Sequence, residues 1–128
     1  MRPTAIALLV VTGAFVAAPA GAHHALSMFD RHTTVTITGV LKEFTWGNPH
    51  VWFELVSDTS DGMVTEWSIE AGSPTVLARG GWRPTALKPG DIVSVGIHPR
   101  KDGISGGYLN DGEPLRVNGR TLIVGVKR

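Results

Sequence analysis

The segment VTITGVLKEFTW, residues 35–46, decides the fold that this sequence predicts. Val35 and Ile37 alternate with threonines, which is the period-2 pattern of a half-buried β-strand. After Gly39 the apolar positions change parity, to Val40, Phe44 and Trp46. A β-bulge or a sharp coil at Gly39 explains the change, and long coiled strands of this kind turn the corners of small barrels.

Two further strand-like runs follow closely. Gly47-Asn48-Pro49 is a turn signal, and residues 50–56 then alternate between apolar and polar side chains. Residues 57–62 form a polar loop before a third alternating run over residues 63–70. Three strands joined by short loops predict an antiparallel meander.

The period changes after the third run. Ser73 before Pro74 is typical of a helix N-cap followed by proline at the first helical position. Residues 75–79 supply one to two turns, and Gly80-Gly81 ends them. We therefore expect one short helix.

The remainder of the chain again has strand character. A turn at residues 87–91 leads into a fourth strand at residues 93–98, and Tyr108-Leu109 forms a short one. Asn118-Gly119 is a strong hairpin signal between residues 115–117 and 121–126, and we expect the last of these runs to close the barrel.

This order of elements predicts a mainly β fold. Three strands, a short helix and two or three more strands match a five- to six-stranded OB-like Greek-key barrel. A small β-sandwich fits the same order and remains an alternative.

The first 22 residues have the pattern of a secretory signal peptide. Arg2 precedes an apolar run at residues 5–18, and Ala20-Gly21-Ala22 is a small-x-small cleavage site. Cleavage there leaves residues 23–128 as a single OB-like β domain without a membrane span, in the periplasm or secreted. A cut after Ala20 and retention of the segment as a permanent anchor are the alternatives.

Composition and charge exclude several functional classes. Without Arg2, the 12 basic residues fall to 11 and equal the 11 acidic ones. Binding to a nucleic acid backbone needs a basic face, so we expect no nucleic acid partner. The sequence has no cysteine, so burial alone must stabilise the fold and no thiolate chemistry is available.

Several motifs together resemble a family of exported bacterial proteins classified as a domain of unknown function. They are His23-His24 after the signal, Trp46-Gly47-Asn48-Pro49-His50, Gly72-Ser73-Pro74, Gly81-Trp82 and Leu87-Lys88-Pro89-Gly90-Asp91. The resemblance implies a periplasmic location and an OB-like barrel, and it implies no established reaction.

The histidine pair at the predicted new N-terminus is a candidate metal site. A free α-amine on His23 with its own imidazole forms a chelate of the kind that suits copper(II). His24 and His50 are the further candidate ligands, and Cu(II) is the one cofactor that the sequence suggests. The alternative is a pair of polar residues that only keep the cleavage site open.

The turn and strands around His50 form a candidate ligand site. Trp52 lies on the parity opposite to Val51 and Phe53, so its indole is expected on the outer face, where it can stack on a ligand or contact a partner. The candidate ligand-binding residues are Trp46, Asn48, His50, Trp52 and Glu70. In the alternative interpretation, the turn is purely structural and the indoles belong to the core.

Other polar and aromatic residues have structural interpretations. Glu70 is interpreted as forming a surface ion pair with Arg79 or Arg83, or as a charge at the start of the helix. We expect Trp82 to plug one end of the barrel. His32 and His98 are interpreted as solvated edge residues.

No catalytic motif is present, so a non-enzymatic function is expected. The leading hypothesis is an exported binding or accessory protein with an unknown small ligand. A copper(II)-binding protein and a module that docks an envelope protein are the alternatives.

Overall fold

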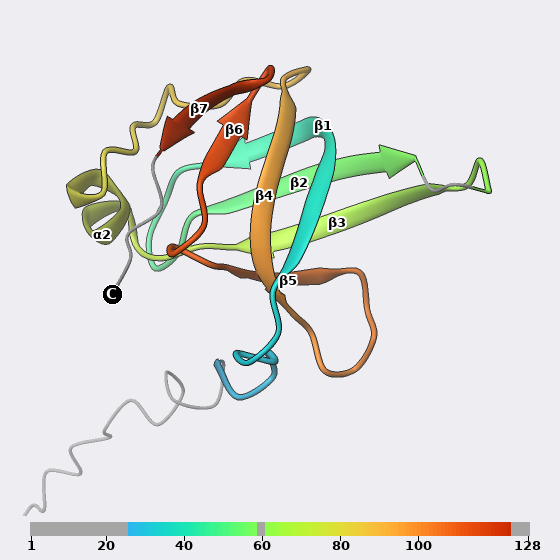
Figure 1. Ribbon diagram of the computed structural model, residues 1–128. Helices are drawn as coiled ribbons and strands as arrows, with labels where there is room; N and C mark the ends of the chain where they lie inside the picture. Colours follow the sequence, from blue (N-terminus) through green and yellow to red (C-terminus); the bar gives the residue numbers. More distant parts are fainter. Residues whose placement is uncertain (1–25, 59–60, 124–128) are drawn as a thin grey trace, which may run out of the picture.

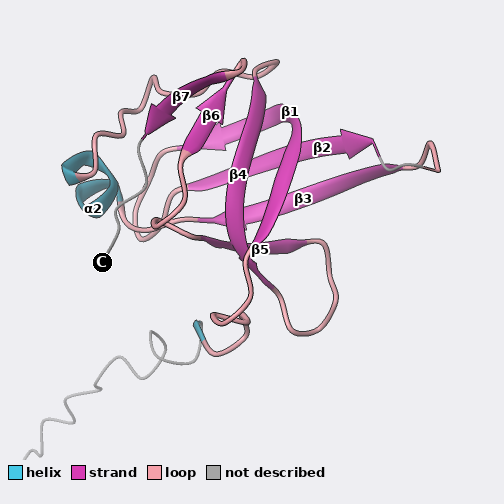
Figure 2. Cartoon of the chain, in the orientation of Figure 1, coloured by secondary structure: helices cyan, strands magenta, loops and turns pink. Residues whose placement is uncertain are grey.

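The computed structural model describes residues 26–58 and 61–123 of the chain (Figure 1). Within them, strands predominate and a short helix, α2, lies between β3 and β4 in the chain (Figure 2). The elements are β1 (Val35–Thr45), β2 (Trp52–Asp58), β3 (Val64–Glu70), α2 (Pro74–Arg79), β4 (Ile92–Pro99), β5 (Gly106–Leu109), β6 (Leu115–Val117) and β7 (Arg120–Ile123).

Five of the strands close into a barrel in the order β1-β2-β3-β5-β4. Strand β1 closes it because Val40 pairs with Val56 of β2 on one side and with Ile92 of β4 on the other. Strands β3 and β5 are parallel, and the other barrel pairs are antiparallel. This topology confirms the predicted OB-like barrel, and a single closed sheet excludes the β-sandwich.

The C-terminal hairpin does not close the barrel, and that expectation is wrong. Strand β6 adds to β4 outside the ring, and β7 pairs with β6 through Arg116 and Thr121. The turn between them has the predicted form, with Asn118 at φ 50° and Gly119 at φ 78°. Residues 124–126 lie outside the described residues.

The bulge in β1 lies three residues later than the sequence suggested. Burial alternates through Ile37, Gly39 and Leu41, and the register with β2 then shifts between Leu41 and Glu43. Val40 is therefore 47% exposed, and it does not share the inward face with Phe44. Gly39 has a different role, because a Cβ there would lie 2.6 Å from the carbonyl oxygen of Val56, so glycine permits the close approach of β1 to β2.

Apolar side chains from every barrel strand fill the interior. Phe53 and Trp82 pack with ring centroids 6.3 Å apart, and Trp82 is buried. Ser73 caps α2 by accepting a hydrogen bond from the backbone N–H of Val76. The largest fully buried side chains are Phe53, Leu41, Leu55, Ile69, Ile97, Leu115, Val51, Val93 and Val95.

The lead-in at residues 26–34 is held against the β4–β5 side of the barrel (Figure 1). Phe29 forms an isolated bridge with Arg100, and its ring lies 5.7 Å from that of Tyr108. The Lys101 backbone N–H donates to the Met28 carbonyl at 2.9 Å. Among the described residues, we find no helix with the length and hydropathy to span a membrane.

Candidate functional site

A buried carboxylate lies at the end of β3, on the outer face of the barrel. Glu70 follows the inward-facing Ile69 and should point to solvent, yet only 6% of it is exposed. His50 covers it, and its Nδ1 bonds to Glu70 Oε1. The expected ion pair with Arg79 or Arg83 is therefore wrong.

The reason for this difference is the local geometry around α2. The Arg83 guanidinium donates to the carbonyl oxygens of Ala78 and Trp82, at 3.3 and 2.9 Å, so it holds the end of the helix. His50 instead precedes β2, which is the strand paired with β3. Burying the Glu70 carboxylate costs free energy, and its hydrogen bond with His50 offsets that cost.

A row of side chains crosses the barrel beside this pair. Trp52 of β2 lies opposite Glu70, Glu70 lies opposite Tyr108 of β5, and Tyr108 lies opposite His98 of β4. Residues paired in register point to the same side of a sheet, so these four share the outer face. The Trp52 indole is 39% exposed, in agreement with the alternation in the sequence.

His98 is not the solvated edge residue that the sequence suggested. It pairs with Tyr108 within the barrel and is only partly exposed, and its Nδ1 donates to the Thr33 carbonyl at 2.9 Å. His32 is exposed as expected. The lead-in accounts for the difference, because it reaches the side of β4 next to His98.

Tyr108 is a hydrogen-bond donor at neutral pH. Burial raises the pKa of its hydroxyl, and the charges of Glu70 and Asp111 raise it further, while Arg31 lowers it. Glu70, Asp111 and Arg31 therefore all lie near enough to the Tyr108 hydroxyl to change its pKa.

The turn before β2 contributes less than predicted. Trp46 is partly buried, packs against the core, and makes an edge contact with Phe44 at 6.0 Å. Asn48 is exposed, and the peptide bond to Pro49 is cis. Of the predicted ligand residues, the structure thus brings together His50, Trp52 and Glu70, with Trp46 serving mainly the core.

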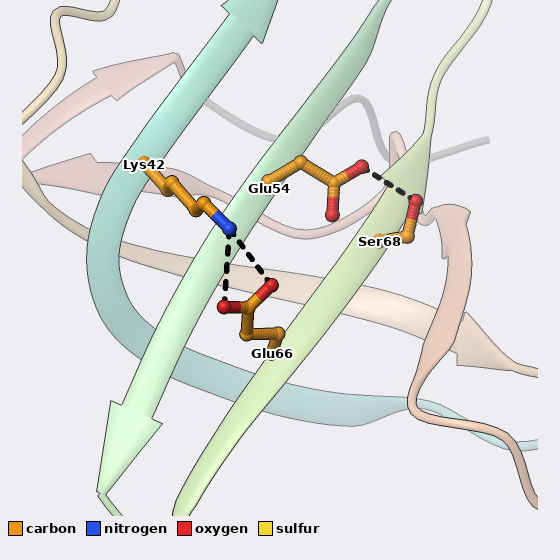
Figure 3. Close-up of polar contacts among 4 residues, drawn as sticks. All are labelled: Lys42, Glu54, Glu66 and Ser68. Atoms are coloured by element: carbon orange, nitrogen blue, oxygen red, sulfur yellow. Dashed lines mark hydrogen bonds and ion pairs between the residues drawn. The ribbon is translucent and has the colours of Figure 1, made fainter.

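Carboxylates dominate the outward side of β1, β2 and β3. Glu43 lies directly opposite Glu54 in the β1–β2 register, and Glu54 accepts a hydrogen bond from Ser68 at 2.7 Å. Like charges directly opposite each other on a sheet are unfavourable. We call this surface, with Trp52 and Glu70, the acidic face; its charged residues are Glu43, Glu54, Glu66, Glu70 and Lys42. Figure 3 shows Lys42, Glu54 and Glu66 of this set.

Lys42 is the one ammonium group among those five charged residues. Its Nζ contacts both carboxylate oxygens of Glu66, at 3.1 and 3.0 Å (Figure 3). This hydrogen bond raises the pKa of Lys42, and the charges of Glu66, Glu54 and Glu43 add to the effect. Both partners are more than half exposed, so the ion pair itself contributes little to stability.

Sequence reasoning missed Glu43 and Glu54 as a pair, because no local signal gives the register of β1 against β2. With the register shift between Leu41 and Glu43, Glu43 faces outward beside β2. Glu54 alternates with Phe53 and Leu55, so its outward direction could be read from the sequence.

Two cavities are lined by Val76 and Leu77 of α2. One has a volume of about 220 Å³ and adjoins Arg31, His98 and Tyr108. The other has a volume of about 280 Å³ and adjoins Trp82 and Leu115. No motif in the sequence pointed to them.

The predicted copper ligands His23 and His24 lie outside the described residues. His50, the third predicted ligand, is described, and its Nδ1 faces Glu70. Across residues 26–58 and 61–123, no group of three or more histidine, aspartate or glutamate residues is placed to hold a metal ion.

The closed barrel and its outer face define a class, the small OB-like barrel proteins. Within that class, the chain belongs to DUF6152, a family of unknown function, whose model matches residues 11–110. No curated protein matches the chain.

A solved structure with a similar backbone is Rim1, a mitochondrial single-stranded DNA-binding protein from S. cerevisiae. It is 15% identical, with a TM-score of 0.47, and the match covers 67% of this chain and 94% of that one. This TM-score is too low for the neighbour to support an argument about this chain.

Proposed function

We propose that this protein is an exported, non-enzymatic binding protein that holds an organic cation on the acidic face. The observation that carries the proposal is the exposed Trp52 indole beside the buried Glu70 and a surface with three carboxylates and one lysine. An indole attracts a cation over its ring, and nearby carboxylates add charge-assisted hydrogen bonds.

The Glu43–Glu54 pair supports a cationic ligand in particular. The two carboxylates face each other across β1 and β2, and Lys42 is already bonded to Glu66. A guanidinium or ammonium group between Glu43 and Glu54 relieves their repulsion. A phosphate backbone on the same face increases that repulsion, which supports the expectation that no nucleic acid binds here.

Titration with agmatine, which carries both a guanidinium and an ammonium group, tests the proposal. We expect a saturable change in tryptophan fluorescence with the exported form of the protein. Trp52→Ala should weaken binding by about tenfold, since cation–π contacts contribute up to about 2 kcal/mol. Glu54→Gln should also weaken it, whereas Glu113→Gln, which removes an exposed carboxylate elsewhere, should not.

Three results would overturn this function. They are the absence of saturable binding, equal binding by Trp52→Ala and the parent chain, and stronger binding of an oligothymidylate than of agmatine. A basic segment of an envelope protein presents the same chemical groups. If such a protein is captured and agmatine displaces it, then the cation comes from that protein, and the proposed binding site stands.

Copper(II) binding is the second candidate function, and the His50–Glu70 pair favours it. Histidines that bind metals usually donate their other ring N–H to a carboxylate or a carbonyl, which orients the ring. Glu70 is that carboxylate for His50, and Nε2 is then the nitrogen that a metal uses. His23 and His24 supply the remaining ligands in this proposal.

Copper uptake by the exported form tests this candidate. We expect one equivalent of Cu(II), with loss of affinity in His50→Ala and in a chain that has one extra N-terminal residue. His32→Ala is the matched control, because His32 is exposed and is neither a proposed copper ligand nor part of the His50–Glu70 pair. Equal uptake by the native and extended forms would refute the chelate.

A further inference from the structure

The smaller of the two cavities combines an apolar wall with polar groups of both charge signs. It is lined by both the lead-in and α2, and its volume is about 220 Å³. Phe29 of the lead-in, Leu77 of α2 and Leu109 of β5 form its apolar wall, and each of them is at most 6% exposed. We call this cavity the lead-in pocket.

Carboxylates determine the charge at the Tyr108 hydroxyl. Tyr108 lines the lead-in pocket together with Asp111 and Arg31, and the charges of both act on its hydroxyl. Glu70 does not line the pocket, but its charge acts on the same hydroxyl. Two negative charges therefore oppose one positive charge at this point, and a cationic group is favoured beside it.

The lining also supplies the hydrogen-bond acceptors that an ammonium group needs. His98 lines the pocket, and its Nδ1 donates to the Thr33 carbonyl at 2.9 Å, so Nε2 of the neutral ring is an acceptor. The Tyr108 hydroxyl oxygen and the Asp111 carboxylate are acceptors as well. A primary ammonium group has three N–H donors, which equals the number of these acceptor groups. The polar lining therefore matches a primary ammonium group.

Arg31 adds a site for a carboxylate in the same pocket. Its guanidinium group carries several N–H donors, and such a group binds carboxylates with two parallel hydrogen bonds. Arg31 and Asp111 both act on the Tyr108 hydroxyl, so the two opposite charges lie within a short distance of one point. An α-amino acid carries its ammonium and carboxylate groups on one carbon, and it satisfies both charges at once. A simple amine would leave its own charge beside that of Arg31 without compensation.

The volume of the lead-in pocket limits the size of the ligand. A dry apolar cavity of about 150 Å³ holds one benzene molecule, which is a share of about 25 Å³ for each carbon atom. At this share, a cavity of about 220 Å³ holds about nine non-hydrogen atoms. Leucine and isoleucine have this size, and their branched side chains suit the apolar wall.

We propose that the lead-in pocket binds an α-amino acid with a branched aliphatic side chain. The ammonium group of the ligand lies beside Tyr108 and Asp111, and its carboxylate lies beside Arg31. Its side chain packs against Phe29 and Leu77. This site goes beyond the cation on the acidic face, because none of the residues that line the pocket belongs to that face.

L-leucine is the probe for this proposal, and two analogues each lack one of its charged groups. They are 3-methylbutylamine, which has no carboxylate, and 4-methylpentanoate, which has no ammonium group. Calorimetry of the exported form should show one saturable site for leucine. The amine should bind at least about fivefold more weakly, because it loses a charge-assisted contact. The carboxylate analogue should bind most weakly, because Glu70 and Asp111 repel it.

Two variants with matched controls locate the two charged groups of the ligand. Arg31→Gln should weaken leucine binding by about fivefold and should not weaken the binding of 3-methylbutylamine. Arg120→Gln is its control, because Arg120 is exposed and does not line the pocket. Asp111→Asn should weaken both leucine and 3-methylbutylamine, whereas Asp58→Asn, at an exposed aspartate outside the pocket, should weaken neither.

The proposal fails if leucine shows no saturable binding, or if either analogue binds as tightly as leucine. It also fails if Arg31→Gln and Arg120→Gln bind leucine equally well. Circular dichroism of each variant separates loss of binding from loss of fold. If Asp111→Asn does not fold, Tyr108→Phe replaces it, and removal of the hydroxyl should weaken leucine and 3-methylbutylamine alike.

Discussion

A methyl group added at Gly39 should destabilise the barrel where β1 approaches β2. In Gly39→Ala the new Cβ would lie 2.6 Å from the carbonyl oxygen of Val56 and 2.9 Å from its carbon. Ordinary contacts begin at 3.4 Å, so the backbone of Val56 must move by roughly 0.8 Å. Val56 pairs with both Val40 and Glu66, so the movement disturbs two ladders of the barrel.

The expected cost follows from two opposing terms. Overpacking against a well-packed region costs about 1–3 kcal/mol, and replacement of glycine by alanine returns about 0.4–1 kcal/mol through the unfolded state. The net loss is about 1–2 kcal/mol, or a decrease in Tm of roughly 5–15 °C for a domain of this size.

Urea unfolding followed by tryptophan fluorescence, together with thermal melts, measures this loss. Gly47→Ala is the matched control, because no atom lies within 4 Å of the position of its new Cβ. Its stability should stay the same or rise by a few tenths of a kcal/mol. The reasoning is refuted if Gly39→Ala is as stable as the parent chain, or if Gly47→Ala loses as much.

Three further predictions concern the packing of the core, the cap of the helix and the stability of the fold at acidic pH. Phe53→Ala should cost about 3–5 kcal/mol in urea unfolding, because Phe53 is 1% exposed and packs on Trp82. Ser73→Ala should cost about 1 kcal/mol in the same assay by removing the cap of α2. Arg100 lowers the pKa of Asp102 to about 2 from 3.8, so the ionised carboxylate stabilises the fold above the unfolded pKa, and this contribution is lost as the pH falls toward 2. The difference in Tm between the parent chain and Asp102→Asn should therefore be present at pH 5 and vanish near pH 2.

The sequence was sufficient to predict those elements for which hydrophobic alternation and turn chemistry agree. Ser73 and Pro74 determined the start of the helix, and Asn118-Gly119 determined the last hairpin. Trp52 was placed outside because it alternates with buried neighbours on both sides. In each case the deciding residues lie within a few positions of each other in the chain.

The features that could not be predicted depend on long-range pairing. The bulge falls at Lys42 because β1 changes its partner from β4 to β2 nearby, and no local signal marks that change. The partner of Glu70 depends on where the turn before β2 places His50, twenty residues earlier. The sequence instead suggested Arg79 or Arg83, which lie nearer to Glu70 in the chain.

The filled interior of this barrel restricts where a ligand can bind. Phe53, Leu55 and Ile69 are at most 1% exposed, and Trp82 is also buried, so the core leaves no room for a ligand like those of wider barrels. Binding must then use the outer surface, where the acidic face lies. The acidic face presents carboxylates and an indole on strands paired along their length, which holds their spacing fixed. We therefore expect the acidic face to select its ligand by charge geometry.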